Sequence, residues 1–400
     1  MKMIKRVFTI IICCVIAGCF GNICFAEDSD GSQVVEYEDY NYISEPEFMS
    51  KCTSESMVLF EASTGEMLLC KNETSVRAGG HLVKLMTLLL VAEQIDCEAI
   101  SLNSVVTVSK HANSMQGTQI WLNVGEKITI EELIKAISIG NANDACVALA
   151  ECVGKSESEF VAMMNDKAKT LSMHNTVFVD STGISDKSVT TAEDVAKLCC
   201  EFSKYDFLVP YLTTWLDNVR SNATELVNNN TLVKSYNGIT GMKACFGDKS
   251  GNCIAASAKR NDMTLIAVIL GAKSKDNCFS EAKEMLNFGF AAYQLFNPTL
   301  PVEISNPIYV HRGEKLDCEI QTDNYTSILI PKYRADDVNI EYDILDRVTA
   351  PVFENSEVGI VWFLLDDKIL CQRRIVTSEA VDELTIRVAF YRLWSKLIKM

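Results

Sequence analysis

The chain has 400 residues, of which 48% are hydrophobic and 22% charged, a globular composition that excludes a disordered or collagen-like chain. Its 53 acidic residues outnumber 37 Lys and Arg, and the net charge of −16 argues against nucleic acid as a partner. The 16 cysteines are too dilute for a disulfide scaffold. There is no Cys-x-x-Cys motif and the four histidines are scattered, so neither a metal site nor another cofactor is predicted.

Residues 1–26 are predicted to be a signal peptide. Lys2, Lys5 and Arg6 precede an apolar run over residues 7–19, which is too short to span a bilayer comfortably and ends in small residues. Cleavage after Ala26 is the first choice, and a lipoprotein box ending at Cys19 is the alternative. Either processing route predicts an exported protein.

Residues 27–48 hold eight acids and no Lys or Arg, which predicts a solvated acidic tether.

Twelve cysteines follow Ala26, and many of them lie in apolar runs. A free cysteine behaves as a small buried hydrophobe, so we expect mostly buried, reduced thiols, with their pairing left open. Examples are Cys70, Cys146, Cys199 and Cys200.

Residues 49–296 predict strands, then helices, then strands again. Apolar runs at 57–60 and 67–70 flank Ser63-Thr64-Gly65 and indicate a hairpin, and the Leu-rich stretch 81–95 indicates a buried helix. Later patterns indicate strands at 253–258 and 264–270 and a helix at 280–295. Both ends of this segment are therefore expected to close one sheet.

Three pairs of residues have the spacing that starts a helix, in which an N-cap hydroxyl precedes an acid by three positions. These pairs are Thr129 with Glu132, Ser156 with Glu159, and Thr190 with Glu193.

Composition changes at Asn297, and residues 297–380 are predicted to form a small all-β domain of short alternating strands. Examples are 327–330, 339–344, and a hairpin of 358–365 with 369–375.

Residues 381–400 are predicted to form an amphipathic helix that lies in a membrane interface. Packing of this helix on its own domain is the alternative. From residue 384 onward its only charges are Arg387, Arg392, Lys396 and Lys399.

Several long stretches resemble the serine D-alanyl-D-alanine carboxypeptidases, the low-molecular-mass penicillin-binding proteins that trim cell-wall stem peptides. They are residues 58–66, 121–129, 143–151, 213–215 and 250–260. The resemblance covers the chain from about Ser50 onward. It implies an α/β fold with a β-lactamase/DD-peptidase-like domain, an antiparallel sheet flanked by a helical region, at residues 49–296. The small all-β domain and the terminal amphipathic helix follow.

That family works by acyl transfer with three motifs. In the first, Ser-x-x-Lys, the Lys takes the Ser proton and the alkoxide attacks the D-Ala–D-Ala carbonyl. Here the corresponding residues 79–84 read GGHLVK, so His81 occupies the position of the nucleophile and Lys84 keeps that of the general base.

The other two motifs are also altered. In the second, Ser-x-Asn, Asn141 replaces the hydroxyl residue and Asn143 keeps the substrate-binding amide. In the third, Lys-Thr-Gly, Lys243 remains, but Ala244 removes the Thr hydroxyl and Cys245 places a side chain at the Gly position. The resemblance implies that Lys243, Ala244 and Cys245 lie where a substrate carboxylate and peptide would bind.

These changes predict little or no activity. Without an acyl-accepting oxygen there is no acyl-enzyme, and loss of the nucleophile from such a unit costs about 10⁶-fold in rate. A His81 nucleophile is disfavoured because the ring is bulky and acyl-imidazoles hydrolyse readily. The Ser-x-x-Lys at Ser280 is interpreted as a chance match, and Cys245 as a small residue on a half-buried strand rather than a substitute nucleophile.

Three hypotheses about function follow. The first is an exported pseudoenzyme at the outer face of the membrane that binds peptidoglycan stem peptides, or a cell-wall partner, without cleaving them. Lys84 and Lys243 would then keep its pocket cationic toward a peptide carboxylate, although with Asn143 they could instead form a polar core network. The alternatives are a genuine D-Ala-D-Ala carboxypeptidase and a structural cell-envelope protein.

Overall fold

The computed structural model describes residues 46–398 apart from 248, 301–303, 305 and 323–326, and it omits the side chains of 392, 393, 396 and 397. The predicted signal peptide and residues 27–45 of the predicted tether lie outside the described residues. The described chain begins with a short 3-10 helix, η1 (Glu47–Lys51).

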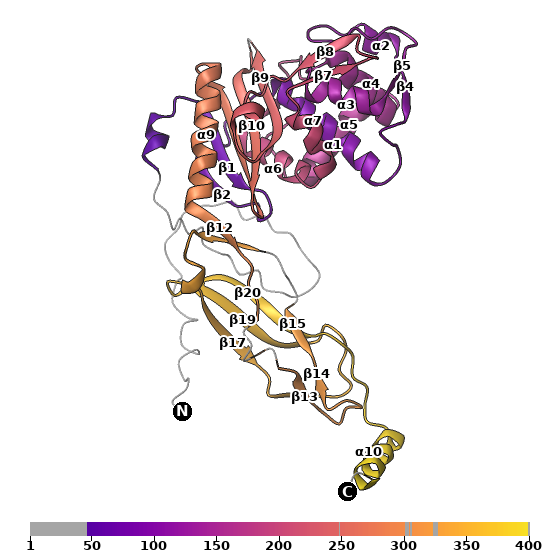
Figure 1. Ribbon diagram of the computed structural model, residues 1–400, viewed down its shortest axis with the longest axis vertical. Helices are drawn as coiled ribbons and strands as arrows, with labels where there is room; N and C mark the ends of the chain where they lie inside the picture. Colours follow the sequence, from indigo (N-terminus) through magenta and orange to yellow (C-terminus); the bar gives the residue numbers. More distant parts are fainter. Residues whose placement is uncertain (1–45, 248, 301–303, 305, 323–326, 399–400) are drawn as a thin grey trace, which may run out of the picture. The chain divides into compact units, whose positions relative to one another are not determined.

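A five-stranded antiparallel sheet is the centre of the first domain (Figure 1). Its order is β2-β1-β11-β10-β9, so strands from both ends of the domain close one sheet, as the sequence predicts. The strands are β1 (Ser56–Glu61), β2 (Met67–Lys71), β9 (Ile239–Gly247), β10 (Gly251–Arg260) and β11 (Met263–Ala272). β1 is buried along its whole length, which suits its apolar sequence and its place inside the sheet.

Helices cover both faces of this sheet (Figure 1). Alternate residues of each strand face opposite sides, so Val58 packs in the core of the helical region while Leu59 packs in the core beneath α9 (Lys275–Ala292). The larger helices of the helical region are α1 (Val83–Asp96), α3 (Ile130–Ser138), α4 (Asn143–Gly154), α5 (Glu157–Thr170), α6 (Ala192–Phe202) and α7 (Val209–Thr213).

Short elements connect these helices. They are β3 (Arg77–Ala78), η2 (Gly80–Leu82), β4 (Val105–Thr107), α2 (Lys110–Asn113), β5 (Lys127–Thr129), β6 (Val189–Thr190), η3 (Asp206–Leu208), β7 (Leu216–Val219), β8 (Thr224–Val227) and α8 (Leu232–Ser235).

Two of the three predicted helix starts are confirmed. Thr129 and Glu132 form a reciprocal capping box on α3, and Ser156 accepts a hydrogen bond from the Glu159 N–H at the start of α5. The third is wrong by one residue, because Thr191 caps α6 by accepting from the Asp194 N–H. Thr190 belongs to β6, and its hydroxyl is 2.8 Å from that of Thr176.

The predicted helix at 280–295 is displaced. α9 runs over Lys275–Ala292, and Ser274 caps its start by accepting from the Asn277 N–H at 3.1 Å. Its predicted last turn is instead the strand β12 (Tyr293–Phe296), which pairs with β16 (Ile328–Pro331). Pairing with a distant strand therefore overrode the local helical pattern.

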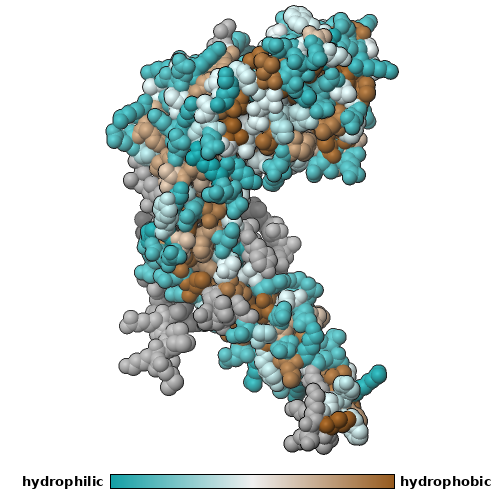
Figure 2. All heavy atoms as spheres, viewed as in Figure 1, coloured by the Kyte–Doolittle hydropathy of each residue, from teal (hydrophilic) through white to brown (hydrophobic). Residues whose placement is uncertain are grey.

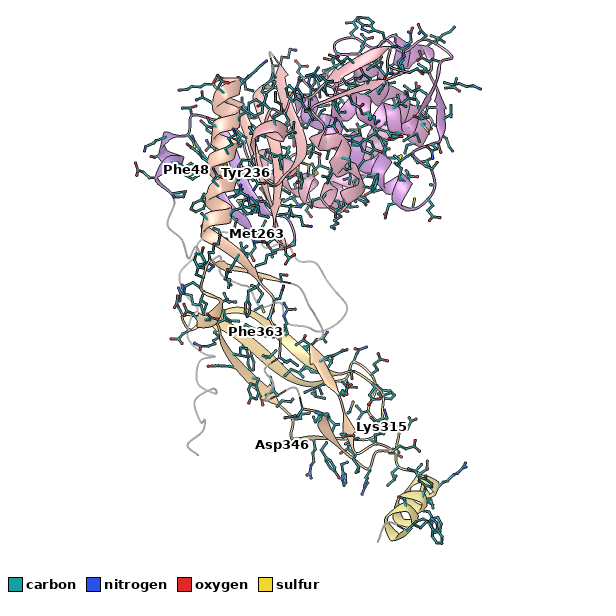
Figure 3. The ribbon with its side chains drawn as sticks, viewed as in Figure 1. Phe48, Tyr236, Met263, Lys315, Asp346 and Phe363 are labelled. Carbon is teal, nitrogen blue, oxygen red and sulfur yellow. The ribbon has the colours of Figure 1, made fainter. Side chains whose placement is uncertain are left out.

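Aromatic residues from two other segments pack on α9 (Figure 3). The Phe48 ring lies 6.1 Å from that of Phe288, and the Tyr236 hydroxyl donates to Asn287 Oδ1 at 2.9 Å. Phe48, at the end of the predicted tether, therefore takes part in the packing of this domain.

The second domain is all-β, as predicted. A four-stranded sheet has the order β15-β20-β19-β17, and a three-stranded sheet has the order β14-β13-β18. Val310, Val361, Phe363 and Ile375 are fully buried in its core (Figure 3). Its strands are β13 (Ile308–His311), β14 (Asp317–Cys318), β15 (Ile320–Thr322), β17 (Asn339–Ile344), β18 (Arg347–Thr349), β19 (Glu357–Leu365) and β20 (Lys368–Thr377), with a 3-10 turn η5 (Ala335–Asp337).

The described chain ends in the helix α10 (Ile386–Ile398). Several of its described apolar side chains are exposed to solvent, and Figure 2 shows apolar surface on this helix. Ile386 is 91% exposed, Phe390 65%, Tyr391 72% and Trp394 57%. None of the helices in the described part of the chain is both long and apolar enough to cross a membrane.

The twelve cysteines after Ala26 are all free thiols. Cys146 and Cys199 are buried and Cys200 is half-buried, but Cys70 is exposed, contrary to expectation. β2, which carries Cys70, is an edge strand of the sheet, and Met67 and Cys70 are exposed there while Leu68 and Leu69 are buried.

Candidate active site

The three altered motifs meet in the helical region beside β9. The Lys84 Nζ lies 2.7 Å from Asn143 Oδ1, which joins the first motif to the second. The His81 backbone N–H donates to Cys245 Sγ at 3.1 Å, which joins the first motif to the third. Residues far apart in the chain are therefore brought together as the resemblance implies.

Lys84 lies on the first turn of α1 and is completely buried. Its amine donates to Asn143 Oδ1 and, at 2.5 Å, to the Thr182 carbonyl. The Asn143 amide is oriented because its Nδ2 donates to the Gln116 carbonyl at 2.7 Å. Burial holds the pKa of Lys84 below its ordinary value of 10.5, as a general base requires.

Lys243 is 2% exposed, and its amine donates to the Ile137 carbonyl at 2.5 Å and the Ser138 carbonyl at 2.8 Å. Burial and the nearby charge of Lys84 lower the pKa of Lys243 to about 7. Both lysines therefore bond to groups inside the protein, which is the polar core network that the sequence left open.

His81 lies in η2, just before α1, and is half-buried. Burial, followed by the charges of Lys84 and Lys243, lowers its pKa to about 3, so the ring is neutral at physiological pH. Its Nδ1 is buried and has no hydrogen-bond partner among the described atoms. A neutral imidazole thus stands where the family has a hydroxyl.

Cys245 fills the space beside the His81 backbone. Its Sγ is also 3.2 Å from the Ser250 hydroxyl, and the residue is 1% exposed. A Cβ placed on Gly80, whose φ is +51°, would lie 2.7 Å from both Cys245 Sγ and the Ser250 side chain. Cys245 and Ser250 therefore pack closely against the backbone of Gly80 and leave no room for a side chain at position 80.

Asn141 and Ala244 do not add open polar surface to the site. Asn141 is 2% exposed in a left-handed conformation, with a φ of +59°, and its Oδ1 is buried without a partner among the described atoms. Ala244 is 2% exposed and belongs to the core cluster beneath α9, so its side chain points away from the motif residues. The expectation that Ala244 lines the cleft is therefore wrong, because residue 244 points to the opposite face of β9 from Cys245.

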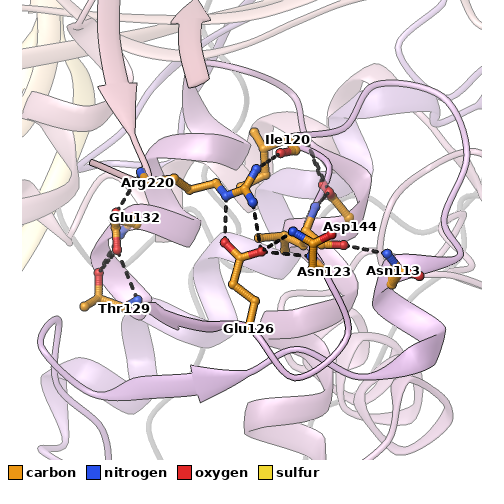
Figure 4. A network of polar contacts seen from close by, with 9 residues as sticks. Asn113, Ile120, Asn123, Glu126, Thr129, Glu132, Asp144 and Arg220 are labelled. Carbon is orange, nitrogen blue, oxygen red and sulfur yellow. Dashed lines mark hydrogen bonds and ion pairs between the residues drawn. The ribbon is translucent and has the colours of Figure 1, made fainter. Parts of the chain in front are cut away.

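A polar network fixes the loop that holds Asn143 (Figure 4). Asp144 accepts from the backbone N–H groups of Ile120 and Leu122, and Arg220 donates to the Ile120 carbonyl at 2.8 Å. The same guanidinium binds both carboxylate oxygens of Glu126, at 2.6 and 2.9 Å. This bidentate pair ties the β7–β8 turn to the loop before α3.

Sequence reasoning missed several groups at the site. The carbonyls of Gln116, Ile137, Ser138 and Thr182 bind the motif side chains, and Ser250 contacts Cys245. Backbone carbonyls carry no side-chain signal, so no pattern could have identified four of these groups. Among the described residues, no cluster of His, Cys, Asp or Glu could hold a metal ion.

Comparison with known proteins agrees with this architecture. Residues 41–274 match the model of the Peptidase_S11 family, D-alanyl-D-alanine carboxypeptidase, and residues 302–383 match the penicillin-binding protein 5 C-terminal domain. The chain belongs to the D-alanyl-D-alanine carboxypeptidase family.

Members of this family from several bacteria are similar over most of the chain. D-alanyl-D-alanine carboxypeptidase DacF of Bacillus subtilis is 34% identical over 331 residues, which cover 82% of this chain and 85% of that protein. DacC of Escherichia coli is 29% identical, covering 82% and 84%. The structure of penicillin-binding protein 5 from Haemophilus influenzae matches with a TM-score of 0.74 at 23% identity, over 85% of this chain and all of that one, and shows the shared fold.

At the positions that the resemblance assigns to the three motifs, the site holds the amines of Lys84 and Lys243, the amide of Asn143 and the imidazole of His81. The structure places Lys84, Asn143, Lys243 and Cys245 together and buries all four. His81 is the one predicted motif residue of the described chain that retains partial exposure.

Proposed function

We propose that this protein is an exported, non-catalytic member of the carboxypeptidase family that acts in the cell wall, on or near peptidoglycan stem peptides. The observation that carries the proposal is the contact between the His81 N–H and Cys245 Sγ at 3.1 Å. Through this contact Cys245 engages the backbone donor of His81, the residue that stands at the nucleophile position.

Acyl transfer requires an attacking oxygen or sulfur and free donors aimed at the developing oxyanion. His81 supplies neither hydroxyl nor thiol, and its backbone N–H is engaged. Cys245 carries a sulfur, but that atom accepts the His81 N–H in a packed interior, where it is closed to a peptide substrate. The geometry therefore supports loss of catalysis more strongly than the sequence alone.

We also expect ligand recognition to differ from the hypothesis that Lys84 and Lys243 keep the pocket cationic toward a peptide carboxylate. A cationic pocket would need an amine that is free to meet a carboxylate, whereas Lys84 and Lys243 each donate to two groups within the protein. We therefore expect any stem-peptide contact in this cleft to be weak and contact with the cell wall to use other surfaces. A purely structural role remains the alternative outcome.

Export and membrane attachment are part of the proposal. The predicted signal peptide supports export, and the exposed apolar residues of α10 support peripheral attachment at the outer face of the cytoplasmic membrane. Packing of α10 on its own domain is disfavoured by the 65% exposure of Phe390 and the 57% exposure of Trp394.

The test of the proposal is D-Ala release from a pentapeptide that ends in D-Ala-D-Ala, measured in parallel with sedimentation of the protein with insoluble peptidoglycan. We expect no release above the buffer control and measurable co-sedimentation. Release that depends on Lys84 would instead establish a genuine carboxypeptidase. Absence of both release and co-sedimentation would favour the structural role.

A further inference from the structure

Two buried cysteines face each other across the β9–β10 hairpin. In the antiparallel register Cys245 is the direct partner of Cys253, and each residue is 1% exposed. Both belong to the core cluster on the helical side of the sheet, while their neighbours Ala244 and Ile254 belong to the cluster beneath α9. The two thiols therefore lie on the same face.

The thiols also share a neighbour. Cys245 Sγ is 3.2 Å from the Ser250 hydroxyl, and the Cys253 thiol donates to the Ser250 carbonyl at 3.0 Å. Directly opposed residues of an antiparallel pair have Cβ atoms about 4.5–5.5 Å apart, and disulfides need about 3.5–4.5 Å. A small adjustment of the hairpin thus brings the sulfurs within bonding reach.

We propose that Cys245 and Cys253 form a reversible cross-strand disulfide, and that this bond removes the sulfur acceptor from the His81 N–H. The proposal does not depend on whether the site is catalytic. It assigns a covalent modification site to two residues, one of which stands at an altered family motif and the other on the neighbouring strand.

The reaction is thiol–disulfide exchange with a low-molecular-mass disulfide. One cysteine thiolate attacks the reagent and releases one thiol, and the second thiolate attacks the mixed disulfide and releases the other. The two protons lost from the cysteines end on the two released thiols, and the reagent takes both electrons. Burial raises the pKa of Cys253 to about 12, so exchange should be slow and should quicken with rising pH.

The position of the pair favours access. The hairpin turns between Gly247 and Gly251, which face each other two residues from the cysteines. Gly247 and Lys249 are exposed, so the pair lies close to a solvent-exposed end of the hairpin. Cys253 also lies where the β10–β11 register shifts, between Asn252 and Ile254, a local irregularity in the ladder.

The formed bond would alter the contact at His81. At present Cys245 Sγ accepts the His81 N–H, and a sulfur turned toward Cys253 across the hairpin leaves that acceptor position. The His81 amide would then exchange with solvent more readily, which gives a readout separate from the bond itself.

The experiment treats full-length folded protein with oxidised glutathione, then blocks free thiols and digests with trypsin. Cleavage after Lys249 separates the two cysteines, so the disulfide appears as two linked peptides, residues 244–249 and 250–259. We expect this linkage, loss of two hydrogen atoms from the intact mass, reversal by dithiothreitol, and faster amide hydrogen exchange at His81.

Cys253→Ser and Cys253→Ala should abolish the linked peptides and leave His81 exchange unchanged by the reagent. Cys278→Ser is the matched control, because Cys278 is a fully buried cysteine in the other core cluster, and it should behave as the wild type. Free thiols at both positions, separate glutathione adducts, or linkage of Cys278 to either residue would each overturn the proposal.

Discussion

The backbone N–H of His81 donates to the Sγ of Cys245 at 3.1 Å, which joins η2, just before α1, to the last part of β9. In a working acyl-transfer site, donors of this kind are kept free for the oxyanion, and the space beside them admits the substrate. Here a side chain occupies that space, and a neutral imidazole replaces the nucleophile. The Cys245 side chain therefore engages a backbone donor of a residue that lies far from it in the sequence.

Penicillin should leave no covalent mark on the wild-type protein. An acyl-enzyme needs an accessible nucleophile, whereas position 81 carries a neutral, bulky ring and the Cys245 sulfur is buried. Intact mass spectrometry after incubation with the β-lactam checks this expectation. An added mass equal to the drug, mapped to His81 or Cys245, would contradict the pseudoenzyme proposal.

His81→Ser alone should recover little carboxypeptidase activity. It restores a hydroxyl one helical turn before the Lys84 amine, but Cys245 still fills the adjacent space and Asn141 still lacks the second hydroxyl. Members of one catalytic unit are strongly non-additive, so repair of one member has a small effect.

The matched comparison is the combined variant His81→Ser, Asn141→Ser and Cys245→Gly. We expect it to release D-Ala from a pentapeptide at least about 10-fold faster than the single variant, which corresponds to about 1.4 kcal/mol of transition-state stabilisation. Equal rates at equal folded concentration would show that the strand and loop substitutions are neutral.

Removal of aromatic residues from α10 should weaken membrane attachment. Phe390 and Trp394 are exposed, and their rings stack with centroids 6.2 Å apart. Burying each large apolar side chain contributes about 1.5–3 kcal/mol, so the double Ala variant should bind anionic vesicles at least 10-fold less tightly, by the same scale of about 1.4 kcal/mol per tenfold.

Tyr333→Ala is the control for this measurement, because Tyr333 is 84% exposed but lies outside α10. Vesicle co-sedimentation of the control should equal that of the wild type. If the double variant also sediments as the wild type does, the attachment resides elsewhere in the chain, with Cys19 as the sequence alternative.

Lys243 should make the protein more stable as the pH rises from about 7 toward 10. Its pKa is lowered to about 7 in the folded state against an ordinary 10.5, so between these values the unfolded chain binds more protons than the folded one. Stability rises with pH under that condition. Below about pH 7 the buried ammonium carries its full desolvation penalty.

Lys243→Met should therefore flatten the rise in the free energy of unfolding between pH 7 and 10, measured by urea denaturation. Lys259→Met on the exposed surface of β10 is the control and should keep the wild-type slope. A wild-type slope in the Lys243 variant would show that this amine does not titrate in the window.

Much of the fold could be predicted from the chain itself. Continuous apolar runs predicted the strands now seen as β1, β10 and β11, and a run of leucines predicted α1 because a helix buried on all sides must be apolar all round. The resemblance to the carboxypeptidases also implied that His81, Lys84 and Asn143 meet beside Lys243. Local patterns were sufficient because a strand or helix that is buried on all sides consists of a nearly continuous run of apolar residues.

Other features depended on contacts between distant segments. Tyr293–Phe296 became a strand because β16 pairs with it, and Ala244 points toward α9 because the pleat turns alternate residues of β9 to opposite faces. The sequence also left open whether Lys84 and Lys243 would present their charge to a ligand. The sequence by itself determined the family and the sheet, and the resemblance assigned His81 to the position of the nucleophile. Only the tertiary structure decided that Cys245 fills the cleft and that both amines bond internally, because carbonyl positions and packed volume arise only when the chain is folded.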